Sequence, residues 1–191
     1  MMDIQERTVK QLEQLALKGP KHIEAIIQEA PELGYIVGAP PAEGRGAGAS
    51  IRIENYDRYS ALVRYLEVYD NSLTVDSQQS QAYLEQCAAE IIRRVTFLEE
   101  PLALLEVEPV EGIAQLRSGA PLAEQSEERV VYWELWLRTA PHPRLKLARY
   151  EWRQGKRDRE NLLYPMTFAT LGRAAKELAA SLAEAAKQIN R

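Results

Sequence analysis

The order of apolar and polar residues predicts helices at both ends of the chain. Apolar positions recur at broadly helical spacing in residues 3–17, and a second short helix is expected over 21–30. In residues 55–69 a stripe at i, i+3, i+4 and i+7 predicts an amphipathic helix; the stripe consists of Tyr59, Leu62, Val63 and Leu66. A longer helix is expected over 76–98. The last, alanine-rich segment, 167–189, also has helical spacing.

Alternating patterns predict strands elsewhere. Two short extended pieces are expected at 35–37 and 50–54, joined by a loop over 38–48 that is rich in glycine and proline. From residue 102 the apolar period becomes two, which is typical of strands with one buried face. Short connections join neighbouring antiparallel strands, so this part is expected to form a meander.

We therefore predict an α+β fold with N-terminal helices, a four-stranded antiparallel β-meander over about residues 102–153, and a C-terminal helix packing on the sheet. The length suits a single domain over 1–191, with a mainly helical half, 1–100, and a half, 101–191, made of the meander and its closing helix. No internal repeat or linker is evident, and residues 117–128 are interpreted as a long hairpin loop.

The composition is that of a globular protein, with 46% hydrophobic and 27% charged residues. The first residues lack the basic and apolar regions of a signal peptide, and no apolar run approaches the roughly 18 residues that a bilayer span requires. We therefore expect a cytoplasmic protein that does not insert into a membrane.

The net charge of −4 conceals an uneven distribution. Residues 1–128 hold 11 Lys and Arg against 22 Asp and Glu, whereas residues 129–191 hold 13 against 6. A basic C-terminal part can attract an anionic partner, or it can hold the acidic part of the same fold. The charge pattern alone leaves both explanations open.

Few residues carry metal or redox chemistry. The two histidines, His22 and His142, belong to no metal-binding spacing, and Cys87 is the single cysteine. Cys87 lies in a helical pattern, where a packed small hydrophobe is expected. We predict no metal site and no cofactor.

Signals for catalysis are equally sparse. The glycine-rich loop is followed by an extended segment, whereas a phosphate-binding loop is followed by a helix. There is no nucleophile motif such as GxSxG. Glu106 and Glu108 are paired carboxylates on one strand face, but such pairs are usually solvated or face basic neighbours. We expect a protein that is not an enzyme, and we predict no catalytic residue.

The segment 130–159 combines aromatic and basic residues. Four aromatic residues are expected on one face of two adjacent strands: Tyr132, Trp136, Tyr150 and Trp152. Aromatic side chains dominate interface energies, so these four are the candidate interaction residues. Basic residues follow them, and the candidate anion or nucleic-acid site consists of Arg149, Arg153, Lys156, Arg157 and Arg159.

The leading hypothesis is a non-enzymatic cytosolic accessory protein that engages a protein partner or another copy of itself as a homodimer. One alternative is nucleic-acid binding through the basic segment 144–159. A pI near 5.4 and the lack of a known nucleic-acid motif argue against it. The other alternative is a small-molecule binder or enzyme whose pocket is gated by the loop 38–48.

Overall fold

The structure is a computed structural model that describes residues 2–22, 26–30, 34–119 and 128–190. The described residues form three α-helices, α1 (Ile4–Lys18), α2 (Ser80–Arg94) and α3 (Phe168–Ile189), with short 3₁₀ turns at Pro20–His22 and Ser77–Gln79. The strands are β1 (Ile26–Ala30), β2 (Gly34–Ala39), β3 (Ala47–Tyr56), β4 (Ser60–Asp70), β5 (Leu102–Glu108), β6 (Ile113–Ser118), β7 (Arg129–Arg138), β8 (Arg144–Arg153), β9 (Glu160–Leu162) and β10 (Tyr164–Thr167).

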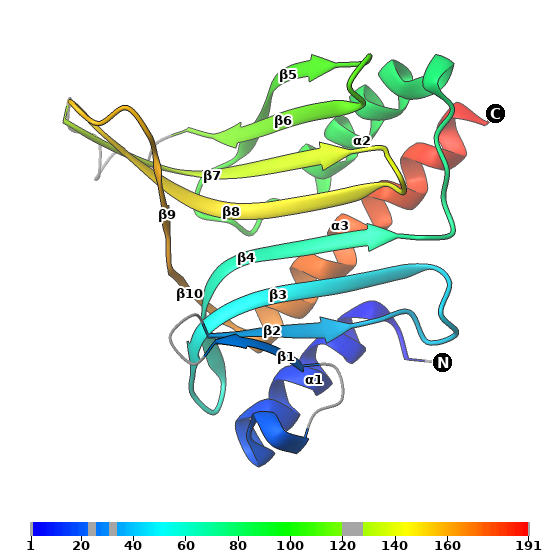
Figure 1. Cartoon of the computed structure of the whole chain (residues 1–191). Helices are drawn as coiled ribbons and strands as arrows, with labels where there is room; N and C mark the ends of the chain where they lie inside the picture. The colour runs from blue at the N-terminus through cyan, green and yellow to red at the C-terminus, as the bar shows by residue number, and fades with distance from the viewer. Residues whose placement is uncertain (1, 23–25, 31–33, 120–127, 191) are drawn as a thin grey trace.

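The strands form one antiparallel sheet in the order β1-β2-β3-β4-β8-β7-β6-β5 (Figure 1). Two four-stranded meanders, each preceded by a helix, are thus joined through their last strands, β4 and β8. In this central pair Leu66 stands opposite Leu147, and both side chains are buried. The topology therefore repeats an α-ββββ unit that the sequence does not reveal.

The central strands separate at one end, and the segment β9-β10 fills the gap. β8 pairs with β4 over its first residues and then with β9, while the first residues of β4 pair with β10. The side-chain amide of Asn161 donates to the carbonyl oxygens of Arg64 and Arg149, each over 3.1 Å. Asn161 therefore links β4 and β8 where their backbones no longer bond to each other.

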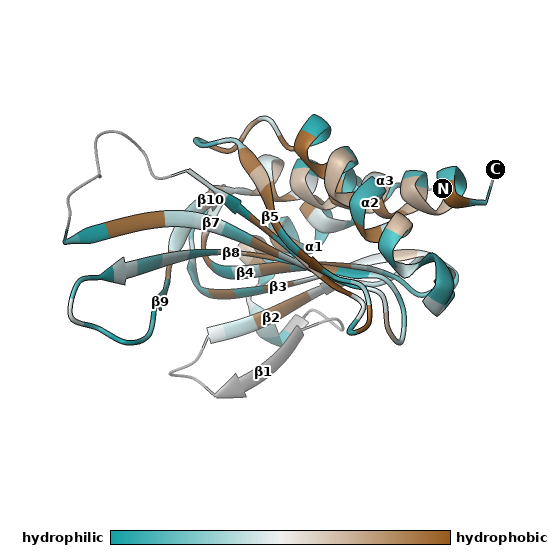
Figure 2. Ribbon diagram, turned by 90° about the horizontal axis from the view of Figure 1, so that it is seen from above, coloured by the Kyte–Doolittle hydropathy of each residue, from teal (hydrophilic) through white to brown (hydrophobic). Residues whose placement is uncertain are grey.

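All three helices pack on one side of the sheet and share one core with it; Figure 2 shows α2 and α3 on that side, and α3 lies between α1 and α2 (Figure 1). Capping residues fix two helix starts: Asp3 and Glu6 form a capping box on α1, and Thr167 accepts from the Thr170 backbone on α3. α3 buries its apolar stripe completely, including Leu171, Leu178 and Leu182. None of the described helices is long and apolar enough to span a membrane.

The prediction of an antiparallel α+β fold is confirmed, but its four-stranded meander is wrong. The expected strands exist as β5 to β8, yet they are only four of the ten strands of the sheet that the described residues form. The expected series of N-terminal helices is also wrong, because the four strands β1 to β4 lie between α1 and α2. The helices expected at 3–17, 76–98 and 167–189 are present, with shorter bounds in the second case.

Two predicted helices are strands. The segment 21–30 contains β1, and the segment 55–69 lies mostly in β4. The segment 21–30 is too short for its apolar periodicity to distinguish a helix from a strand. Residues 23–25 of this segment lie outside the described residues. Of the predicted hairpin loop 117–128, residues 120–127 also lie outside them.

A β-bulge explains the misleading helical spacing in β4. The register against β3 shifts near Arg64, which is an extra residue in its strand. Before the bulge Ala61 and Val63 are buried, and after it Leu66 and Val68 are buried. The extra residue turns a spacing of two into a spacing of three between Val63 and Leu66, which imitates a helix.

Close packing of α1 on α3 requires a glycine at position 172. A Cβ atom there would lie 2.6 Å from Cγ2 of Val9 and 3.1 Å from the Gln5 carbonyl oxygen. We expect Gly172→Ala to lower the free energy of unfolding by about 1–3 kcal/mol through overpacking, although alanine favours a helix by roughly 1 kcal/mol.

Urea unfolding of a double-mutant cycle with Val9→Ala measures this clash, because Val9→Ala removes the nearest atom. The penalty of Gly172→Ala should shrink or change sign in that background. An equal penalty in both backgrounds would mean that the contact between the helices is not what excludes a side chain.

Candidate functional site

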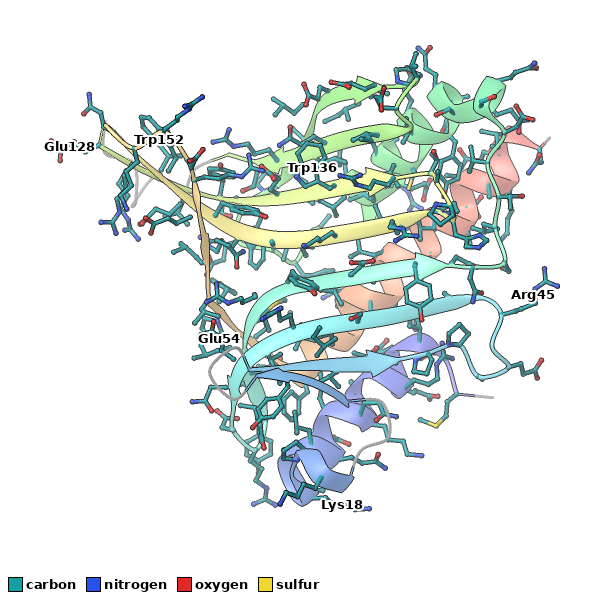
Figure 3. The ribbon with its side chains drawn as sticks, in the orientation of Figure 1. Lys18, Arg45, Glu54, Glu128, Trp136 and Trp152 are labelled. Atoms are coloured by element: carbon teal, nitrogen blue, oxygen red, sulfur yellow. The ribbon has the colours of Figure 1, made fainter. Side chains whose placement is uncertain are left out.

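The sheet surface turned away from α1, α2 and α3, called the open face below, carries a mixture of aromatic and charged side chains (Figure 3). Successive side chains of a strand point to opposite sides. On β8, Leu145 and Leu147 belong to the core under the helices, so Arg144 and Lys146 lie on the open face. The register then places Trp136 and Glu67 beside Lys146 on that face.

The four aromatic residues singled out from the sequence lie on the open face. Tyr132 stands opposite Tyr150, and their rings stack at 6.3 Å. Trp136 stands opposite Lys146, whereas Trp152 lies six positions further along β8, about 20 Å away. Figure 3 accordingly shows Trp136 near the middle of the sheet and Trp152 toward the end of the β7-β8 ribbon. Trp136, Tyr150 and Trp152 are half-buried, but Tyr132 is buried.

The buried carboxylate of Glu134 binds two side chains of this aromatic surface. Its side chain is 1% exposed, and one carboxylate oxygen, Oε1, accepts from the Trp136 indole and, over 2.7 Å, from Arg159. The Arg159 guanidinium also lies 4.7 Å from the centre of the Tyr150 ring. In the part of the chain that the structure describes, the second oxygen, Oε2, has no hydrogen-bond partner. Glu134 and Arg159 therefore hold Trp136 and Tyr150 in fixed positions.

Of the two stacked phenols, Tyr132 is buried and Tyr150 is half-buried. Burial raises the pKa of Tyr132 and of Tyr150, and neighbouring arginines offset part of that rise. Arg117 lies 3.5 Å over the Tyr132 ring. Both phenols are therefore neutral near pH 7 and contribute aromatic surface and hydroxyl groups.

A groove of about 450 Å³ opens on this face between β4, β7 and β8. Its lining residues combine three cations, one carboxylate and two aromatic rings: Arg138, Arg144, Lys146, Glu67, Trp136 and Tyr150. Arg138 and Glu67 were not among the candidate residues from the sequence, and Arg144 and Lys146 lie in the basic segment 144–159 without being named as candidate site residues. The alternation of β7 and β8 indicates the side of the basic residues, but the contribution of β4 depends on its long-range pairing with β8.

The candidate nucleic-acid residues are largely paired with carboxylates of the same chain. Arg149 is 4% exposed, lies on the side of the sheet that carries the helices, and binds Glu100 through both terminal nitrogens at 3.1 and 3.3 Å. Arg159 pairs with Glu134, and Lys156 pairs with Glu160. Part of the basic C-terminal charge thus balances carboxylates within the fold.

The remaining candidate cations lie near the end of β8. Arg153 and Arg129 hold the buried Glu151 between them, and Arg157 is exposed. Burial alone would raise the pKa of Glu151, but the two arginines outweigh it and lower that pKa. A carboxylate whose folded-state pKa is lowered stabilises the fold above its unfolded pKa, and this contribution disappears as the pH falls through the folded value.

The loop 38–48 is held by hydrogen bonds, and none of its residues lines the groove. The Asn71 side chain accepts from the Gly46 backbone over 2.8 Å and donates to the Gly44 carbonyl over 2.9 Å. Arg7 on α1 donates to the carbonyl of Ala47, where β3 begins. These bonds favour a fixed turn over a gate.

The residues considered for metal binding or catalysis lie apart. The described residues contain no group of three or more His, Cys, Asp and Glu that could hold a metal ion. His142 contacts the Leu73 carbonyl through Nδ1 at 3.1 Å, and the side chain of His22 lies outside the described parts. Glu106 and Glu108 are exposed on β5. Cys87 is a buried thiol whose pKa is raised by burial, as expected for a packed residue.

If the buried pair of Arg149 and Glu100 stabilises the fold, removal of the Arg149 side chain should lower the free energy of unfolding far more than removal of a surface cation. We expect Arg149→Ala to lower the free energy of unfolding by about 3–5 kcal/mol, because Glu100 then stays buried without its partner. Lys156→Ala is the control, since both members of its pair are about half exposed, and it should cost less than about 1 kcal/mol. Similar urea-unfolding midpoints for the two variants would contradict a structural role of Arg149.

The chain matches no protein-family model, and comparisons with curated proteins and with solved structures find no match either. The role of the open face must therefore be inferred from its own residues and their surroundings.

Proposed function

We propose that this protein is a non-enzymatic cytosolic accessory protein that binds another polypeptide through the open face of its sheet. The observation that carries the proposal is the one-sided covering of the sheet: the three helices pack on one side, and aromatic and charged residues occupy the other. The cytosolic location is supported only by the sequence, which has a single cysteine and therefore no internal disulfide.

The open face has the residue types of a protein interface. Trp, Tyr and Arg are the residues most often responsible for binding energy, and they act best when other groups hold them in place. Trp136 and Tyr150 are held by Glu134 and Arg159, so little side-chain freedom is lost when a partner binds. These two residues are the proposed anchors, and the ring of Tyr132 on the adjacent strand stacks against that of Tyr150.

The alternatives receive less support from the geometry. Four cations of the segment 144–159 already pair with carboxylates, which leaves Arg144, Lys146 and Arg157 for contact with a nucleic acid. The loop 38–48 borders a cavity of about 400 Å³ against α1, but two hydrogen bonds of the Asn71 side chain hold its turn in one conformation. The open face offers aromatic residues in addition to cations, which favours a polypeptide partner.

Photo-crosslinking tests the proposal. A benzoylphenylalanine at position 136, and in a second variant at 152, should cross-link to the same polypeptide in extracts of the source organism. The control carries it in place of Gln86, which is exposed on α2. A cross-link of the purified protein to itself would identify a second copy as the partner.

The cross-linked polypeptide must then bind the purified protein directly. Trp136→Ala is expected to weaken this binding by about 2 kcal/mol or more, or roughly thirtyfold, because it removes a central aromatic anchor. Isothermal titration calorimetry measures the change. The proposal fails if positions 136 and 152 cross-link to no polypeptide, or only to those captured equally from position 86.

A further inference from the structure

The groove on the open face has an excess of positive charge, because three cations and one carboxylate line it. Arg138 and Arg144 stand directly opposite each other on β7 and β8, where side chains are roughly 5 Å apart at Cβ. Like charges in such positions repel. Nothing in the pairing of the two strands requires a cation at both positions, so an anion bound between them would relieve a repulsion built into the free protein.

Within the described residues, the three cations of the groove form no ion pair, although Glu67 stands opposite Lys146 on the neighbouring strand. Among the residues that the structure describes, no carboxylate forms an ion pair with Arg138, Arg144 or Lys146. Arg144 donates to the His142 carbonyl over a long 3.4 Å, and the Lys146 ammonium lies 4.1 Å from the centre of the Tyr65 ring. This differs from the segment 149–159, in which most cations have carboxylate partners.

The groove offers apolar surface beside its charges. Trp136 and Tyr150 line it together with the three cations, and both rings are half-buried. The Trp136 indole N–H already donates to Glu134, so the ring itself is what a ligand would contact. A ligand that matches this arrangement carries carboxylates close to aliphatic or aromatic groups, as a protein segment with alternating acidic and apolar residues does.

The surroundings favour an acidic protein segment over a nucleic acid. Glu67 lies in the groove, and Glu106 and Glu108 lie on the same face along β5. A nucleic-acid strand carries a phosphate at every nucleotide and would meet these carboxylates on leaving the groove, whereas a peptide can place neutral residues there.

We propose that this groove binds an acidic segment of a partner protein. Arg138, Arg144 and Lys146 receive its carboxylates, and Trp136 and Tyr150 contact the apolar side chains between them. The inference rests on the proposed function, because it names the chemistry of the partner for the same open face.

The test is fluorescence anisotropy with a labelled peptide of alternating glutamate and leucine, measured on the full chain at low ionic strength. The wild-type protein should bind this peptide, and it should bind at least tenfold more weakly to a peptide with glutamine in place of glutamate. Added salt should weaken the binding of the acidic peptide, because the contacts are ionic.

The deciding variant is Arg138→Gln with Arg144→Gln. It should lose at least tenfold in affinity for the acidic peptide while its unfolding temperature stays equal to or above that of the wild type, because a repulsion is removed. The control is Lys10→Gln with Arg45→Gln, which changes the net charge equally at exposed positions outside the groove and should bind within twofold of the wild type.

Three outcomes would overturn the inference: no binding of the acidic peptide by the wild type, equal losses in the two double variants, or an oligothymidylate that binds more tightly than the peptide and displaces it. A partner found by cross-linking from position 136 that binds equally well to the arginine double variant would leave the proposed function standing and refute the acidic partner. A drop in the unfolding temperature of that variant would refute the claimed repulsion.

Discussion

The antiparallel pairing of β4 with β8 holds the two halves of the molecule together and fixes which side of the sheet faces the helices. Leu66 and Leu147 meet in this pair and are both nearly inaccessible to solvent. Because side chains alternate along a strand, a slip of one residue would exchange the buried and exposed sets on a whole half of the sheet. The register of this single strand pair therefore determines that Glu67 of β4 and Lys146 of β8 share the open face.

The same strand pair also sets the boundary of the open face. Beyond their paired region β4 and β8 diverge, and Asn161 connects their backbones. On the helix side of this gap the buried Arg149 lies over the rings of Trp133 and Tyr164, which contact each other edge to face at 4.9 Å. Arg149 therefore stabilises the fold. Arg144 and Lys146, which have no carboxylate partner among the described residues, lie in the part of β8 that pairs with β4.

The sequence predicts local features of this fold better than its long-range pairings. The capped, amphipathic helices α1 and α3 and the alternating strands β7 and β8 have periods that local sterics and burial impose, so the pattern finds them. The strand β4 was mistaken for a helix because the bulge at Arg64 changes its period. No local pattern in the sequence reveals that β4 pairs with β8, and the sheet was therefore predicted at less than half its size.

In the candidate site, too, local alternation can be predicted from the sequence and long-range contacts cannot. Alternation predicts that Tyr132 and Trp136 share a face, and it also places Arg149 on the opposite side of β8, together with Leu145 and Leu147. The alternation along β8 therefore indicates that Arg149 is a core residue. The many basic residues around Arg149 favour an exposed anion-binding role instead, and the sequence-based prediction followed them. The pairing of Arg149 with Glu100, far away in the chain, could be seen only in three dimensions.

The central claim is that a partner binds to the open face while the packing between the helices and the other side of the sheet stays unchanged. The chain has three tryptophans, and they report on both sides: Trp133 is buried in the core, whereas Trp136 lies in the groove on the open face. In a two-dimensional ¹H–¹⁵N spectrum of the indole groups, the alternating glutamate and leucine peptide should shift the Trp136 signal and leave the Trp133 signal in place. A shift of Trp133 without a shift of Trp136 would contradict the account.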